Sequence, residues 1–206
     1  MSQDRLRHYR DRRDFRRSPE PTGSGGRKVS SRPIFVIQKH AASQLHYDFR
    51  LELDGALMSW AVPKGPSLDP RERRLAVRTE DHPMDYADFE GVIPQQEYGG
   101  GTVMVWDAGT WKNRSRDNDD RPVSASRALK AGKLQVELWG RKLRGGWALI
   151  RTDSQDSGQE KWLLIKQKDE HADARRKPTS SQPDSVLTER SLKDIAADDD
   201  SGDSGN

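Results

Sequence analysis

The segment HYDFRLEL alternates between ionisable and apolar side chains. Successive side chains of a strand point to opposite faces, so His46, Asp48, Arg50 and Glu52 share one face, about 6.5–7 Å apart along the strand. The other face is apolar and is expected to pack against the core. A polar strand face is commonly just solvated, but solvated faces favour Lys, Glu and Thr. A histidine, two acids and an arginine in one row also suit a metal ion or a phosphate.

A third candidate ligand, His40, lies six residues before His46. Two imidazoles and a carboxylate form the donor set that a divalent ion takes when thiolates are absent. The chain has no Cys, so any metal must be held by His nitrogen and carboxylate oxygen. Spacing alone leaves two interpretations equally open, a metal site at His40, His46 and Asp48 or a solvated strand face.

A second strand, in RRLAVRTEDHP, places Arg74, Arg78 and Glu80 on one face, and His82 follows two residues later. A guanidinium offers phosphate oxygens a planar fork of donors, so arginines beside a His–Asp group suggest a phosphate site. Lys64, in the turn PKGP, is a further candidate cation, although a solvated turn lysine is its simpler interpretation.

Short β-rich runs separated by turn residues dominate the middle of the chain. They cover 33–38, 46–53, 57–62, 74–79, 101–107, 133–140, 145–152 and 161–167. One short helix is predicted over 125–131, with Ser124 as its N-cap and Gly132 just past its end. The glycine run at 99–101 is not followed by a helix, which predicts a hairpin or bulge rather than a phosphate loop. Many short strands with little helix predict an antiparallel barrel or sandwich.

The composition excludes several classes of protein. The 206 residues include 36 Lys or Arg and 33 Asp or Glu, only 32% are hydrophobic, and the mean hydropathy is −1.03. Not every residue can therefore belong to one core. No apolar run reaches the roughly 18 residues of a membrane span, and the first residues lack a signal-peptide stretch. The absence of Cys excludes disulfide scaffolds, iron–sulfur clusters and Cys nucleophiles, which fits a cytoplasmic protein.

The charge divides the chain into three parts. Residues 1–32 hold ten Lys or Arg and four Asp or Glu, which predicts a basic, disordered N-terminal arm. Residues 169–206 hold five Lys or Arg and ten Asp or Glu, which predicts an acidic, disordered C-terminal tail. Residues 33–168 contain all six Trp and are long enough for one core domain. The arm either attracts nucleic-acid phosphate or only solubilises the protein.

The central motifs resemble a known family. The stretch FVIQKHAASQLHYDFRLELDG, followed by WAVPKGPS, EDHPMDY and VWDAGTW within residues 35–111, closely resembles the 3′-phosphoesterase domain of bacterial DNA ligase D. The later GKLQVELWGRKLRGGWALIR and KWLLIKQKD extend the resemblance to about residue 169. It implies a compact antiparallel β-barrel of about eight strands. No polymerase or ligase sequence follows, which is typical of a stand-alone member.

The resemblance also implies roles for individual residues. The implied metal ligands, for Mn²⁺ or another divalent transition metal, are His40, His46 and Asp48. The implied catalytic and phosphate-binding residues are Arg50, Arg74, Lys64 and His82, with His82 as a possible general acid. The residues expected to support the site are Gln38, Glu80, Tyr86 and, in a less defined role, Glu52.

The implied activity is removal of a 3′-terminal ribonucleoside from a DNA end, followed by removal of the remaining 3′-phosphate, during nonhomologous end joining. The implied partners are DNA 3′ termini, Ku and a separate ATP-dependent DNA ligase, which predicts a nucleoid-associated protein. The alternative is a non-catalytic DNA-end-binding barrel that grips phosphate with the same cations. A metal-binding barrel of cupin type is a third reading, but the six-residue spacing of the two histidines does not support it.

Overall fold

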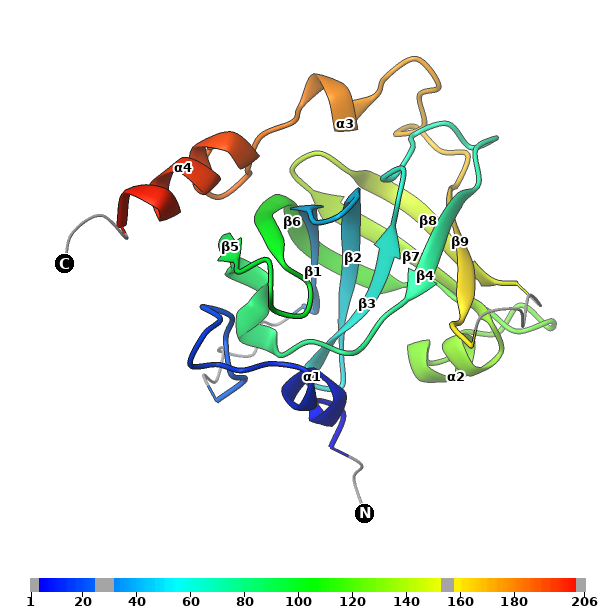
Figure 1. Cartoon of the computed structure of the whole chain (residues 1–206). Helices are drawn as coiled ribbons and strands as arrows, with labels where there is room; N and C mark the ends of the chain where they lie inside the picture. The colour runs from blue at the N-terminus through cyan, green and yellow to red at the C-terminus, as the bar shows by residue number, and fades with distance from the viewer. Residues whose placement is uncertain (1–3, 25–31, 153–157, 203–206) are drawn as a thin grey trace.

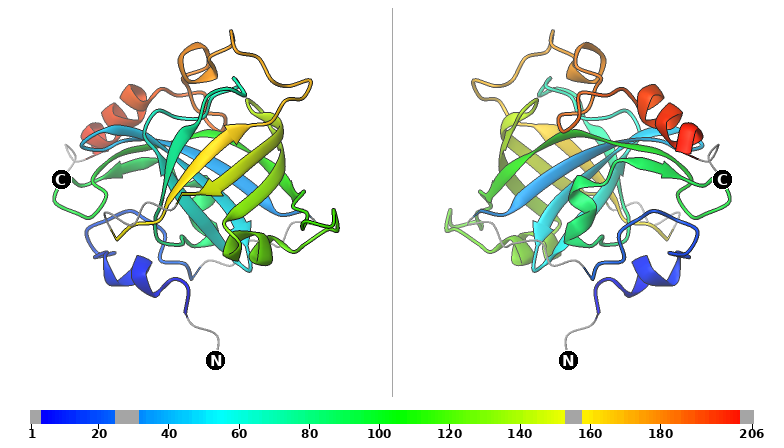
Figure 2. Two further views of the ribbon diagram at one scale, coloured as in Figure 1. Left: turned by 90° about the vertical axis from the view of Figure 1, so that its right-hand side faces the viewer. Right: turned by 90° about the vertical axis from the view of Figure 1, so that its left-hand side faces the viewer.

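The computed structural model describes residues 4–24, 32–152 and 158–202, which contain nine antiparallel strands (Figure 1). The strands are β1 (Ile34–Ala41), β2 (Leu45–Leu53), β3 (Ala56–Val62), β4 (Arg74–Arg78), β5 (Gly91–Ile93), β6 (Gly101–Asn113), β7 (Lys133–Gly140), β8 (Arg144–Arg151) and β9 (Lys161–Lys166). They follow the order β1-β2-β3-β4-β9-β8-β7-β6-β5, and pairing of β1 with β6 closes eight of them into a barrel (Figure 2). The predicted β-barrel is therefore confirmed.

The helices of the described chain are short and lie around the barrel. They are α1 (Arg7–Asp11), the 3₁₀ helix η1 (Met84–Asp88), α2 (Ala125–Lys130), α3 (Pro178–Ser181) and α4 (Leu192–Gly202). Helix α2 is the predicted one: the Ser124 hydroxyl accepts a hydrogen bond from the backbone N–H of Arg127 at 3.2 Å, and Gly132 has φ +79°. None of the described helices is long and apolar enough to cross a membrane.

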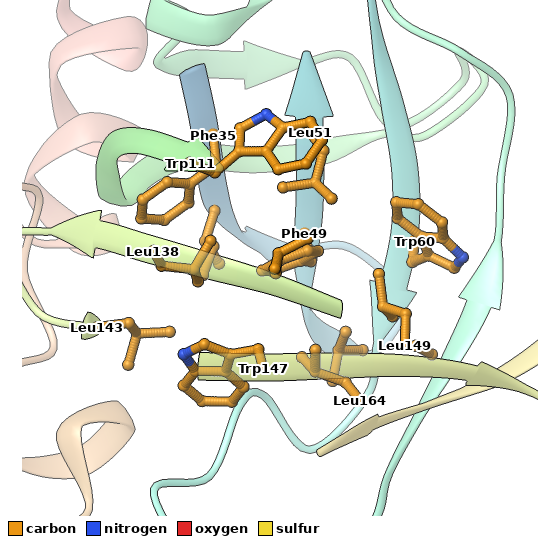
Figure 3. Packing of buried hydrophobic residues seen from close by; sticks show 14 of the residues in the cluster. Phe35, Phe49, Leu51, Trp60, Trp111, Leu138, Leu143, Trp147, Leu149 and Leu164 are labelled. Atoms are coloured by element: carbon orange, nitrogen blue, oxygen red, sulfur yellow. The ribbon is translucent and has the colours of Figure 1, made fainter. Parts of the chain in front are cut away.

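The barrel interior is filled by large side chains (Figure 3). Trp60, Trp147 and Trp162 are buried in it together with Phe49 and many Leu. The apolar face predicted for β2 points into this core. By contrast, Trp139 is 38% exposed, so one of the six tryptophans lies on the surface.

A second, smaller core lies outside the barrel wall. It contains Val36 of β1 and Leu57 of β3, which alternate with residues of the barrel core and so face outward. Tyr9 of α1 and Tyr86 of η1 pack on them, and all four side chains are buried. The arm and η1 therefore cover the outer face of β1, β2 and β3, which is the face that carries the polar row of β2.

The expectation of disordered ends is wrong for their described parts. Tyr9 anchors residues 4–24 of the arm to the barrel, and ion pairs of Arg5 with Asp81 (2.8 Å) and of Arg17 with Glu97 (3.1 Å) add to this contact. In the predicted tail, buried Val186 and Ile195 pack in the two cores. The few apolar residues of both ends are thus enough to dock them. The predicted disorder of 1–3, 25–31 and 203–206 lies outside the described residues.

Candidate active site

A cavity of about 270 Å³ opens on the outer face of β1, β2 and β3. The arm, the segment after β4 and the β5–β6 loop complete its wall. Its ionisable and aromatic lining residues are Arg13, Glu20, His40, His46, Asp48, Arg50, Glu80, His82, Tyr86 and Tyr98. The structure thus gathers residues from both motifs that sequence analysis selected, and adds residues of the arm.

The His–His–Asp cluster, which comprises His40, His46 and Asp48, is assembled by the β1–β2 hairpin. His40 and His46 are cross-strand partners, and Asp48 lies two residues along β2 on the same face. One oxygen of Asp48, Oδ2, lies 3.7 Å from Nδ1 of His40 and 3.7 Å from Nε2 of His46. One potential ligand atom from each residue lies within 4.8 Å of the others. The hairpin register therefore brings together three donors that sequence spacing alone could not place.

The donor atoms of this cluster fit a divalent metal ion. The Nδ1 of His46 lies 3.0 Å from the carbonyl oxygen of Gln44, a contact that fixes the tautomer and leaves Nε2 free to bind a metal. The Nε2 of His40 is buried and has no hydrogen-bond partner among the described residues. Burial opposes ionisation of Asp48, but the charge of Arg50 and the two neighbouring histidines hold its pKa well below its usual value. The cluster therefore offers an anionic oxygen and two imidazoles.

Arg50 is the centre of a buried hydrogen-bond network. Its Nε donates to Oε1 of Gln38 at 2.8 Å, and its Nη2 donates to Oδ2 of Asp48 at 3.1 Å. Its Nη1 donates to the hydroxyl of Ser59 at 2.8 Å and lies 2.9 Å from Nδ1 of His82. The side chain lines the cavity although it is almost fully buried. The planar fork is thus held rigidly beside the cluster.

His82 lies between two arginines. Its Nε2 is 3.4 Å from Nη2 of Arg13, and its Nδ1 contacts both Arg50 and the carbonyl oxygen of Glu80. Burial, followed by the positive charges of Arg50 and Arg13, lowers the pKa of His82 well below its usual value. The imidazole is therefore neutral near pH 7 in the site as it stands.

The arm supplies two buried charged residues that sequence analysis missed. Nε of Arg13 donates to Glu20 at 2.8 Å, and its Nη1 lies 3.2 Å from Glu80. The hydroxyl of Tyr86 donates to the same Glu20 oxygen at 3.0 Å. Arg13 also lies over the ring of Tyr9, 3.8 Å from its centroid. The aromatic residues Tyr9 and Phe15 in an otherwise charged arm were the sequence signal that this segment would dock.

Two of the predicted supporting residues act through the backbone. The Nε2 of Gln38 donates to the carbonyl oxygens of Tyr86 and Phe89, each at 3.0 Å, and so ties η1 to the barrel wall. Glu52 accepts a hydrogen bond from the backbone N–H of Ile34 at 2.8 Å, which fixes the start of β1 rather than the cavity. Glu52 thus has a structural contact here, and its part in the chemistry stays a prediction.

The structure places Lys64 and Arg74 in a neighbouring cavity of about 490 Å³, together with Arg73. Arg74 pairs with Glu72 there. It shares a strand face with Ala76, which belongs to the barrel core, so it does not project from the outer face toward the His–His–Asp cluster. Among the described residues, Lys64 and Arg74 thus line a different cavity from the His–His–Asp cluster. The contact of these two cations with the reacting phosphate stays a prediction.

Comparison with known proteins explains this arrangement. The DNA Ligase D 3'-phosphoesterase domain matches residues 38–151. The chain belongs to this family. It is 52% identical over 191 residues, 91% of its length, to the multifunctional non-homologous end joining protein LigD of Pseudomonas aeruginosa. It is 42% identical over 170 residues, 81% of its length, to the multifunctional non-homologous end joining DNA repair protein LigD of Mycobacterium tuberculosis.

The chain spans only about a fifth of each of these relatives, 22% and 21% of their lengths. The region matched to the 3′-phosphoesterase domain contains the His–His–Asp cluster, Arg50 and His82. It begins at Gln38, so Arg13 and Glu20 of the arm lie outside it. The structure is what connects these two residues to the site.

Proposed function

We propose that the protein is a metal-dependent phosphoesterase that repairs DNA 3′ ends. It removes a 3′-terminal ribonucleoside and then the remaining 3′-phosphate, and leaves a 3′-OH for nonhomologous end joining. The observation that carries the proposal is the His–His–Asp cluster beside two buried arginines, Arg50 and Arg13, in one open cavity. Membership of the 3′-phosphoesterase family and the end-joining relatives support the choice of substrate.

The first reaction breaks the bond between phosphorus and the 5′-oxygen of the terminal ribonucleoside. The oxygen of water forms the new bond to phosphorus, the water gives up a proton, and the 5′-oxygen takes one up. In the second reaction the bond from phosphorus to the 3′-oxygen breaks in the same way, and inorganic phosphate leaves. Both reactions build negative charge on phosphate oxygens, which Arg50 and Arg13 would stabilise.

His82 is the proposed proton donor to the leaving oxygen. It is neutral while the two arginines alone surround it. A phosphate bound between these arginines adds negative charge next to the imidazole, which raises its pKa and favours protonation. Tyr86 and Gln38 keep the surrounding groups in place through the contacts to Glu20 and to η1.

The cofactor is proposed to be Mn²⁺ or a similar divalent ion, held by the His–His–Asp cluster. Such an ion would neutralise phosphate charge and lower the pKa of the attacking water. Mixed imidazole and carboxylate donors suit transition metals better than Mg²⁺ or Ca²⁺, which prefer oxygen ligands. The proposed cellular partners are Ku and a DNA ligase, because the relatives are named for end joining.

A labelled primer–template that ends in one 3′-ribonucleotide tests the proposal. Incubation with Mn²⁺ should give a primer one nucleotide shorter with a 3′-phosphate, and then the 3′-OH form. A second substrate that already carries a 3′-phosphate should give only the 3′-OH form. If the protein binds both DNA ends but changes neither, it is the end-binding barrel of the alternative hypothesis instead.

A further inference from the structure

Tyr98 is a half-exposed aromatic residue at the mouth of the cavity. It lies in the β5–β6 loop, directly before a run of three glycines, and its side chain belongs to the cavity wall. A β-carbon on the adjacent Gly99 would lie 4.0 Å from Cε1 of His40, so this stretch of backbone runs close to the His–His–Asp cluster. Tyr98 is 47% exposed, which leaves ring surface open to a ligand.

Two arginines of the arm contact the ring of Tyr98. Nη1 of Arg12 donates to its hydroxyl at 2.7 Å, and the Arg12 guanidinium lies 4.9 Å from the ring centroid. Arg12 is itself paired with Glu80 at 3.4 Å, and Arg13 lies 5.6 Å from the same ring. These contacts orient an exposed ring at the cavity mouth, which favours stacking of a flat group on it.

The proposed substrate has a flat group that reaches this position. A phosphodiester held beside the His–His–Asp cluster carries the terminal ribonucleoside on its leaving side, and the base is only a sugar away from the reacting phosphorus. Stacking on an aromatic side chain strengthens binding and works for every base, because each base has a π face. A 3′-phosphate end lacks this nucleoside and cannot use the contact.

We propose that Tyr98 is the stacking platform for the base of the 3′-terminal nucleoside, and so a residue that determines affinity for nucleoside-bearing ends over phosphate-only ends. This inference rests on the proposed function, because it takes the terminal nucleoside as the group to be removed. It predicts little preference among the four bases. It also gives Arg12 a positioning role, since that side chain orients the ring without reaching the phosphate.

The test compares DNA ends with and without a terminal base, in proteins with and without the Tyr98 ring. Binding of two primer–templates is measured by fluorescence anisotropy without divalent metal, so that no hydrolysis intervenes. One ends in a normal ribonucleotide and the other in an abasic ribose. The wild-type protein should bind the normal end about tenfold or more tightly than the abasic end, which corresponds to about 1.4 kcal/mol. Tyr98→Ala should reduce this ratio to about one.

Three control variants give each outcome a meaning. Tyr98→Phe keeps the ring and should keep the ratio, although it loses the hydrogen bond from Arg12. Tyr98→Leu keeps apolar bulk without a π face and should lose the ratio even where Tyr98→Ala folds poorly. Trp139→Ala removes an exposed aromatic residue that does not line this cavity, and it should keep the ratio.

Two results would overturn the inference. One is an unchanged ratio in Tyr98→Ala and Tyr98→Leu. The other is an equal loss of affinity for both ends, which would mean that the ring only docks the arm. Failure of the proposed function looks different: both ends would stay uncut with Mn²⁺, whatever the ratio of their affinities.

Discussion

Replacing Arg50 by Lys should cost both stability and rate, because the structure leaves no room for a different donor geometry. The guanidinium serves four groups through three nitrogens, at 2.8–3.1 Å. A lysine ammonium is a single nitrogen, so it can stay with Asp48 but cannot also reach the other groups of the fork. His82 loses least, since its Nδ1 can donate to the carbonyl oxygen of Glu80 instead. Gln38 and Ser59 then lose their buried donor.

The size of the effect follows from these two losses. Each buried polar group left without its partner costs about 1–3 kcal/mol, and relaxation recovers part of this, so Arg50→Lys should lower the free energy of unfolding by about 2–4 kcal/mol. Urea denaturation without metal measures this directly. Single-turnover cleavage should slow by about a hundredfold or more, because one preorganised phosphate donor is misplaced.

Arg74→Lys is the matched control, since Arg74 pairs with the half-exposed Glu72 and a lysine can keep that contact. Its free energy of unfolding should change by less than about 0.5 kcal/mol. A loss of under 0.5 kcal/mol for Arg50→Lys as well would refute the view that the fork holds this network together.

Three further predictions concern other parts of the site. Alanine at any position of the His–His–Asp cluster should abolish Mn²⁺ binding in calorimetry and both hydrolytic reactions; wild-type affinity would remove that residue as a ligand. Arg13→Met should lower the free energy of unfolding by about 3 kcal/mol, because it leaves buried Glu20 without its cation and Glu80 with Arg12 alone; an unchanged free energy of unfolding in urea would contradict this. The pKa of His82 lies well below 6.5 in the folded protein. Below pH 6.5 the unfolded chain therefore binds a proton at His82 that the folded protein does not, and the free energy of unfolding decreases as the pH is lowered. Melting scans at pH 7 and 5 without metal should show a smaller loss for His82→Gln than for wild type.

Much of the barrel could be predicted from short-range pattern. All eight predicted strands exist, because each is a β-rich run bounded by turn residues. The three-residue strand β5 is too short to leave a pattern, and its pairing with β6 supplies the support it lacks by itself. The choice between barrel and sandwich depended on the pairing of β1 with β6, two strands far apart in sequence, and only the structure resolves it.

The site was predictable only where its residues share one strand. The period of two placed Asp48 and Arg50 beside His46, but the same reasoning left their face open to solvent. In the structure that face is covered by the arm. The charged composition of the arm predicted solvent exposure, but Arg13 forms two buried ion pairs there. Arg74 is a different case: its strand face was predicted correctly, but that face carries Ala76 of the barrel core, and its contact with the phosphate stays a prediction.

The most direct test of the proposed activity is the chemistry of the primer end after incubation with excess protein, read by mass spectrometry. Wild-type protein with Mn²⁺ and a ribonucleotide-ended primer–template should yield first a 3′-phosphate and then a 3′-OH primer. Asp48→Ala, at concentrations that bind the same DNA, should leave the primer intact. An intact primer with wild type, or equal rates for the two proteins, would contradict a phosphoesterase centred on the His–His–Asp cluster.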